Sequence, residues 1–160
     1  MAESLDLTAS GARAMTSSTP WWTTRLSYSE ILPDEQGLTC AGFLIRAAGW
    51  FAEQGVVIEG VMTDNAFNYR LSGDFKAALR SLSARHLRPA PYRPQTNGKV
   101  ERFNRTLLEE WAYVRPYQDN QERAALLNAW LHRYNFIRTH TALGGHPPIW
   151  RVNNLLGNYT

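Results

Sequence analysis

The sequence contains a single cysteine and no long apolar run, and each shortage excludes a class of protein. Because Cys40 has no second cysteine to pair with among the 160 residues, an internal disulfide and a metal site built from cysteines are both excluded. No uninterrupted apolar stretch approaches the ~20 residues that a membrane-spanning helix needs. The first residues also lack the basic and then apolar blocks of a secretory signal. We therefore expect a cytoplasmic protein without a membrane partner.

The length and the hydrophobic content of 44% are sufficient for one ordinary core. We expect a poorly ordered leader over residues 1–24, because this stretch is rich in Ala, Ser and Thr and has no sustained periodicity. The core domain is expected over residues 25–151, with a short tail over residues 152–160. A single domain is the prediction.

Positive charge is concentrated in one stretch of the chain, although the net charge is only +3. Residues 1–65 contain three Arg and eight acids, whereas residues 66–105 contain nine Arg or Lys and only two acids. Residues 106–160 contain five Arg and four acids. A basic stretch of this kind fits contact with a polyanion such as DNA. The alternative is that several of these cations only solvate a helix face.

Hydrophobic periodicity predicts an alternation of strands and helices, which indicates an α/β protein. The expected elements are a strand over 25–32, a helix over 39–54, a strand over 56–62, a helix over 74–85, a short edge strand over 86–92, a helix from 96 or 97 to 113, and a helix that Asp119 and Asn120 cap. The segment from Thr139 onward is rich in Gly and Pro, so we expect it to be irregular.

Two carboxylates stand at the ends of separate predicted elements. Asp64 follows an apolar run that ends at Met62, and Glu101 lies within the basic block Pro91–Arg105, one turn into a helix. Two acids in a basic neighbourhood fit a metal site that acts on phosphodiesters. The same acids also fit structural roles, because Asp-Asn closes strands and Glu suits the positive end of a helix.

Four features of the sequence together resemble bacterial insertion-sequence transposases, whose catalytic core belongs to the retroviral-integrase superfamily. They are Thr63-Asp64-Asn65, the separation of Asp64 from Glu101, the block Pro91–Arg105, and the segment Arg138–Gly145 with Pro147 and Pro148 behind it. The resemblance covers residues 25–151. It implies a ribonuclease-H-like integrase core that here lacks its first one or two strands and is followed by two C-terminal helices.

The resemblance also implies a catalytic triad of Asp, Asp and Glu that binds metal. Asp64 matches the second acid and Glu101 the third, so both are expected to be catalytic residues and metal ligands. The first acid of the family would lie on a strand upstream of Arg25, and nothing there resembles that strand. Asp6 and Asp34 are weak substitutes, because Asp6 lacks a neighbouring second strand and Asp34 lies in a solvated turn. We therefore expect a truncated copy that is weakly active or inactive.

Family likeness further implies the cofactor and the partners of the chain. Mg²⁺ or Mn²⁺ is the expected cofactor, with two ions in an intact member of the family. The expected partner is double-stranded DNA, namely the ends of a mobile element and a target. A homo-oligomer is also expected, because strand transfer on two ends requires at least a dimer. The expected location is the bacterial cytosol or nucleoid.

Several further residues are candidates for DNA contact because they flank the two acids. They are Asn65, Arg93, Gln95, Asn97, Gly98, Lys99, Arg102 and Arg105. The structural alternative is a flexible loop that caps the following helix, with arginines that face solvent. Asn135, Arg138 and His140 match a signature of the same family, whose role the sequence does not reveal.

Two other functions compete with a catalytic core. One is a non-catalytic DNA-binding or assembly module that retains the basic face and the helices of such a core. The other is a generic helical interaction protein, which does not explain why both acids stand in their family contexts. The family's missing first acid favours the module, whereas Asp64 and Glu101 favour descent from the catalytic core.

Overall fold

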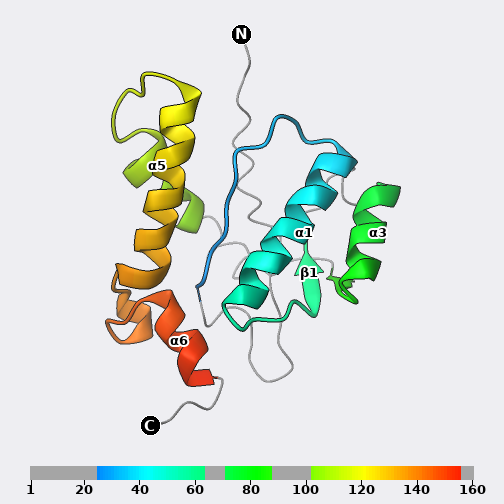
Figure 1. The fold of residues 1–160 in the computed structure, drawn as a ribbon. Coiled ribbons are helices and arrows are strands. Elements are labelled where there is room, and N and C mark those ends of the chain that lie inside the picture. Colours follow the sequence, from blue (N-terminus) through cyan, green and yellow to red (C-terminus); the bar gives the residue numbers. More distant parts are fainter. Residues whose placement is uncertain (1–24, 64–70, 88–101, 156–160) are drawn as a thin grey trace.

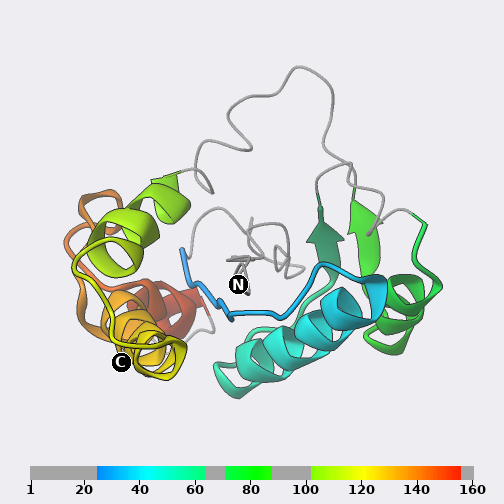
Figure 2. The same ribbon diagram turned by 90° about the horizontal axis from the view of Figure 1, so that it is seen from above.

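The structure, a computed structural model, describes residues 25–63, 71–87 and 102–155. Two groups of elements lie on either side of an extended segment formed by residues 25–36 (Figures 1 and 2). The first group contains α1 (Gly37–Glu53), β1 (Gly60–Met62), α3 (Gly73–Ser81) and β2 (Arg85–Leu87). In the second group, residues 102–107 are helical and are followed by η2 (Leu108–Ala112), α5 (Asn120–His132), η3 (Arg133–Ile137), η4 (Thr141–Leu143) and α6 (Pro148–Leu155).

The two described strands form a parallel pair that is covered on one face by helices. β1 pairs with β2 in the register Gly60↔Arg85, Val61↔His86 and Met62↔Leu87. Val61 is 0% exposed and belongs to the same apolar cluster as buried residues of α1 and α3. Figure 2 shows both helices on the same side of the strands. Strands and helices therefore alternate as the sequence predicts, and the α/β class is confirmed.

Both helices of this group begin and end at residues whose chemistry favours those ends. α1 begins two residues before the predicted helix and ends at Glu53, where Gly55 adopts a positive φ of 78° that glycine tolerates best. α3 begins after Ser72, whose side chain accepts a hydrogen bond from the backbone N–H of Phe75 at 3.1 Å. The prediction that this second helix reaches residue 85 is wrong. The left-handed φ of 53° at Ser83 turns the chain into β2 before that point.

The predicted strand over residues 25–32 is also wrong, because the described structure contains no strand there. The backbone of Ser27 bonds to a side chain instead of a neighbouring strand. Its N–H donates to Asn135 Oδ1 at 2.9 Å, and its carbonyl accepts from Asn135 Nδ2 at 2.7 Å. Asn135 itself is 0% exposed. The buried side-chain amide of Asn135 thus provides the hydrogen bonds that a neighbouring strand would otherwise provide to Ser27.

The second group contains its own apolar core between the helix that begins the group and α5. Leu107 and Trp111 pack with Leu127 and Leu131 of α5 in one buried cluster. As the sequence predicts, Asp119 caps α5, because its carboxylate accepts a hydrogen bond from Glu122 N at 2.7 Å. Nowhere in the described part of the chain is a helix long and apolar enough to cross a membrane.

The prediction of an irregular segment from Thr139 onward is wrong, since η4 and α6 lie there. Gly144 and Gly145 adopt positive φ values of 67° and 82°, so glycine forms a tight turn after η4. Pro148 occupies the first position of α6, where its missing N–H costs no helical hydrogen bond. The buried Val152 of this helix packs into the cluster around α1, so α6 connects the two groups of elements.

We predict that Asn135→Ala lowers the free energy of unfolding by about 3 kcal/mol, because a buried backbone donor and acceptor both lose their partner. Urea denaturation followed by circular dichroism measures the change. Asn128→Ala is the matched control, since Asn128 is exposed on α5. Equal stability of the two variants would contradict the role of Asn135.

Candidate metal centre and nucleic-acid interface

The carboxyl end of β1 is fixed by side-chain contacts up to the residue before Asp64. Thr63 is 4% exposed, and its Oγ1 lies 2.8 Å from His86 Nε2 on β2. The His86 ring in turn stands edge-on to Phe75 of α3, with ring centroids 5.8 Å apart. The chain therefore leaves β1 from a position tied to both β2 and α3.

The side chain of Leu87 on β2 packs against Gly60 on β1, and a side chain at position 60 would displace it. A Cβ atom at this position would lie 3.0 Å from Leu87 Cδ1 and 3.6 Å from the carbonyl oxygen of Arg85. Gly60 thus leaves room for the Leu87 side chain of β2. In α/β folds the carboxyl ends of parallel strands are the usual place for a functional site. Asp64 follows that end in the sequence.

Most of the residues that the sequence predicts for the site lie outside the described residues. They are Asp64, Asn65, Arg93, Gln95, Asn97, Gly98, Lys99 and Glu101. The convergence of Asp64 with Glu101 therefore stays a prediction. In the part of the chain that the structure describes, no three His, Cys, Asp or Glu side chains gather closely enough to hold a metal ion. Asp64 and Glu101 offer carboxylate oxygens, which fit Mg²⁺ or Mn²⁺.

The structure places two of the predicted DNA contacts, Arg102 and Arg105, on the exposed face of the helix that follows Glu101. The opposite face carries Phe103, which is partly buried against the second core. Arg105 Nε lies 3.5 Å from Glu109 Oε1, and these two side chains are 76% and 68% exposed. Exposed ion pairs of this kind contribute little to stability. Both arginines are therefore accessible to a phosphate group.

Three further cations of the basic stretch are exposed in the other group of elements. Lys76 and Arg80 lie on α3, and Arg85 lies on β2. Figure 2 shows α3 and the helix that contains Arg102 and Arg105 at opposite ends of the molecule. The described cations therefore divide between two separate parts of the molecule.

The inward face of the helix that follows Glu101 contacts an aromatic cluster at the end of α5. The ring of Phe103 stands edge-on to Tyr134, with centroids 5.1 Å apart, and Trp130 stacks on Tyr134 at 5.2 Å. Glu110 lies further along, where Arg138 Nη1 forms an ion pair with its Oε2 atom. Trp130 Nε1 donates to the same oxygen at 3.4 Å. These two contacts add to the buried packing of Leu107 and Trp111 against α5.

The structure gives each member of the signature Asn135, Arg138 and His140 a distinct contact. Asn135 binds the backbone of Ser27, and Arg138 binds Glu110. The backbone of His140 organises the turn that follows, since its N–H donates to the His146 carbonyl at 3.2 Å and its carbonyl accepts from Leu143 and Gly145. Sequence reasoning missed Glu110, because nothing in the sequence distinguishes it from its neighbour Glu109.

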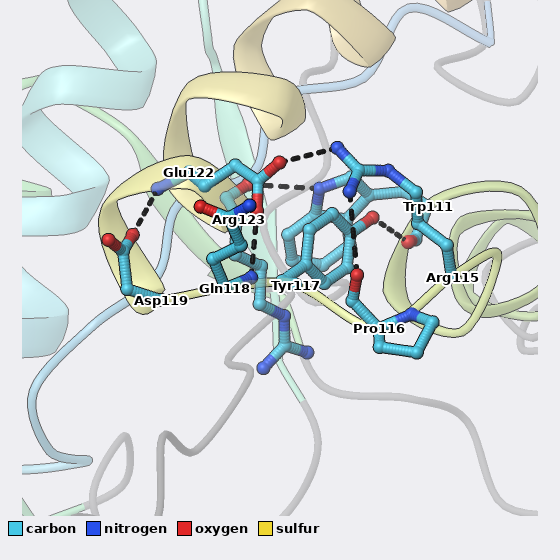
Figure 3. Close-up of polar contacts among 8 residues, drawn as sticks. All are labelled: Trp111, Arg115, Pro116, Tyr117, Gln118, Asp119, Glu122 and Arg123. Carbon is cyan, nitrogen blue, oxygen red and sulfur yellow. Dashed lines mark hydrogen bonds and ion pairs between the residues drawn. The ribbon is translucent and has the colours of Figure 1, made fainter.

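A second network fixes the turn between η2 and α5 (Figure 3). Arg115 Nη2 lies 2.5 Å from Glu122 Oε1, and Glu122 Oε2 accepts a hydrogen bond from the backbone N–H of Gln118 at 2.8 Å. These two contacts lower the pKa of Glu122, the backbone hydrogen bond having the larger effect. Trp111 Nε1 donates to the Arg123 carbonyl at 3.1 Å. Both carboxylate oxygens of Glu122 have partners within the network, which is typical of a structural role.

A third network ties the extended segment to α1. Arg46 Nη2 lies 2.6 Å from Glu30 Oε2, and Tyr28 donates its hydroxyl hydrogen to Glu30 Oε1. Burial opposes the charge on Glu30, but the hydrogen bonds from Arg46 and Tyr28 outweigh it and lower the pKa of this carboxyl. Burial, and then the neighbouring Glu30, raise the pKa of the Tyr28 hydroxyl. The carboxyl of Glu30 is thus ionised when it binds Arg46, and this ion pair attaches the extended segment to α1.

Two comparisons agree with this architecture. Residues 82–148, less than half of the chain, match the family described as "Integrase core domain". The structure also matches the crystal structure of the catalytic core domain of BIV integrase with a TM-score of 0.63 and 21% sequence identity, over 86% of this chain and 84% of that chain. The chain therefore has the ribonuclease-H-like fold of an integrase catalytic core, as the sequence predicts. The family match includes Glu101 and the signature residues Asn135, Arg138 and His140.

We predict that acidification destabilises the protein through His140. Burial is the main cause that lowers the pKa of this imidazole below 6.5, with a smaller effect of Arg138 and Arg25. Its Nε2 atom is buried and has no hydrogen-bond partner in the described structure. Because the folded state favours the neutral ring, this stability is present above pH ~6.5 and is lost as the pH falls through the folded pKa.

Urea unfolding of the wild type and His140→Asn between pH 7.5 and pH 5.5 measures this effect. The wild type should lose more stability than the variant, because only the wild type must protonate this ring. The difference between the two proteins isolates this ring, because the other histidines are present in both. A pH dependence that His140→Asn leaves unchanged would contradict the prediction.

Proposed function

We propose that this chain belongs to the catalytic core of a DNA integrase or transposase, which cleaves and joins phosphodiester bonds with the help of divalent metal ions. The observation that carries the proposal is the match of residues 82–148 to the integrase core domain. This match includes Glu101 and the described helix that follows it. The fold supports the proposal independently, because it is that of an integrase catalytic core.

The proposed metal ligands are Asp64 and Glu101, which come from separate elements. Asp64 directly follows Thr63, whose side chain is fixed against His86, so the chain reaches this acid from an anchored position. In the sequence, Glu101 directly precedes Arg102, the first described residue of the helix that packs through Phe103 against Trp130 of α5. When bound, Mg²⁺ or Mn²⁺ would activate the attacking oxygen and neutralise the charge that develops on the phosphoryl group.

The proposed DNA contacts surround the two acids in the sequence. Arg102 and Arg105 are exposed and accessible to phosphate groups, which carry the sequence-independent part of DNA affinity. The remaining members of this set are Asn65, Arg93, Gln95, Asn97, Gly98 and Lys99. The proposed substrate is the two ends of a bacterial mobile element together with a target duplex. Joining two ends to one target requires at least a dimer.

Catalysis by this polypeptide alone is proposed to be weak. Residues 1–160 contain counterparts of two of the three family acids, Asp64 and Glu101. Fewer carboxylates attract two divalent cations less strongly. We therefore expect Mn²⁺-dependent cleavage that is slow.

A second candidate function is a non-catalytic DNA-binding or assembly module. The exposure of Arg102 and Arg105 also favours this function, because it requires no chemistry at the acids. The two proposals differ in their dependence on metal. A module should bind duplex DNA equally well with and without Mn²⁺ and should not cleave it.

We predict that Asp64→Asn and Glu101→Gln each lower the rate of Mn²⁺-dependent cleavage by at least about 100-fold, because each removes a carboxylate that stabilises the metal ions. Single-turnover cleavage of a labelled duplex at high enzyme concentration measures the rate. Glu53→Gln is the control, since it removes an exposed carboxylate at the end of α1. Cleavage that survives both substitutions would exclude this metal site. Metal-independent DNA binding without cleavage would favour the module.

We predict that Arg102→Gln and Arg105→Gln each reduce the salt dependence of duplex DNA binding, because each removes one phosphate contact. The slope of the logarithm of affinity against the logarithm of salt concentration should decrease by about 0.9 per contact. Fluorescence anisotropy over a range of salt concentrations measures it. Arg133→Gln is the control, because Arg133 is exposed but lies outside the basic stretch. A slope that changes equally in all three variants would exclude a specific contact.

A further inference from the structure

We propose that Glu110 and Arg138 are positioning residues, whose ion pair orients the helix that contains Arg102 and thereby the metal ligand Glu101 directly before it. This inference rests on the proposed function of Glu101. It assigns a role to Arg138, a member of a signature whose role the sequence leaves open. We call the pair of Glu110 and Arg138 the clasp.

The clasp joins two segments that are far apart in the sequence. Arg138 Nη1 binds Glu110 Oε2, and the Nε1 atom of Trp130 donates to the same oxygen at 3.4 Å. The side chains of Arg138 and Glu110 are 35% and 43% exposed, so solvent screens this pair less than a fully exposed one. The guanidinium of Arg138 also lies over the Tyr134 ring at 5.9 Å. Arg138 thus has two partners at once.

The clasp acts together with a second contact of the same helix, that of Phe103 with Tyr134, and the two contacts fix the orientation of the helix. Phe103 precedes Glu110 by seven residues, and both side chains contact Trp130 of α5, so both face this helix. The Phe103 ring contacts Tyr134, and Glu110 contacts Arg138. Two contacts along one face restrict both the tilt of the helix and its rotation about its axis. Phe103 lies only two residues after Glu101 in the sequence, and on this proximity the inference links the orientation of the helix to Glu101.

The neighbouring residue Glu109 is a control for Glu110, because its ion pair lies within one helix. Glu109 carries the same charge and lies in the same π-helical turn, η2, as Glu110. Its partner Arg105 belongs to the same helix, so this ion pair does not connect the helix to any other element. Glu109→Gln and Glu110→Gln therefore remove equal charge, but only Glu110→Gln removes an ion pair between this helix and Arg138.

The experiment measures the Mn²⁺ affinity of the full chain by electron paramagnetic resonance of the free ion. Glu110→Gln and Arg138→Gln should each weaken Mn²⁺ binding by about tenfold, as loss of a group that orients a metal ligand commonly does. Arg138→Lys should restore part of the affinity, because lysine keeps the charge that pairs with Glu110. The double variant should be no worse than either single variant, since both remove the same contact.

The sign of the Arg138 effect separates positioning from general electrostatics. If charge alone mattered, removal of the positive charge of Arg138 would strengthen Mn²⁺ binding, whereas loss of the clasp weakens it. Glu109→Gln should stay within about twofold of the wild type. Urea unfolding of every variant identifies conditions in which all of them are folded, so a loss of affinity does not reflect global unfolding.

The outcomes distinguish the clasp from the proposed metal site. Tighter Mn²⁺ binding by Arg138→Gln, or equal loss in Glu109→Gln and Glu110→Gln, would overturn the positioning role. That role is also excluded if Asp64→Asn and Glu101→Gln weaken Mn²⁺ binding while the clasp variants do not. If neither acid variant changes Mn²⁺ binding, the proposed function fails and the inference falls with it.

Discussion

The buried amide of Asn135 is the contact on which the arrangement of the two groups of elements depends. Its oxygen and nitrogen both bind the backbone of Ser27, so one side chain fixes the position and the direction of the extended segment. That segment reaches three apolar clusters, because Leu26 packs on the core around α1, Ile31 on the core beneath α5, and Leu32 beside Phe43. A segment with no strand partner thus becomes the connection between two cores.

Local chemistry explains which parts of the fold could be predicted from the sequence. The helix α1 follows from its apolar periodicity and from Gly55, and α5 follows from the cap at Asp119. These signals act over a few residues and need no knowledge of the rest of the chain. The strand predicted around Ser27 is wrong because the hydrogen-bond partner of this residue lies 108 residues away. Gly144, Gly145 and Pro148 mark a turn and a helix start, although their density in the sequence suggests irregular structure.

The same limit applies to the candidate site. Resemblance identifies Asp64 and Glu101 as site residues, and their approach to each other stays a prediction. Phe103 lies on the inner face of its helix, and Arg102 and Arg105, which the sequence predicts as DNA contacts, are exposed. The difference between Glu109 and Glu110 is not predictable, because it depends on where Arg138 lies in space. Sequence spacing reveals contacts within a helix, but contacts between helices require the fold.

The position of Cys40 has a practical consequence for studies of motion in this protein. Its side chain is buried in the core around α1, and its sulfur donates to the carbonyl of Glu35 at 3.6 Å. The native thiol is therefore shielded from bulky reagents in the folded state. A cysteine introduced at an exposed position such as Ala125 on α5 would be the preferred site of attachment for a spin label or a dye. With one such cysteine in each group of elements, the distance between the groups becomes measurable, and Cys40 does not have to be replaced.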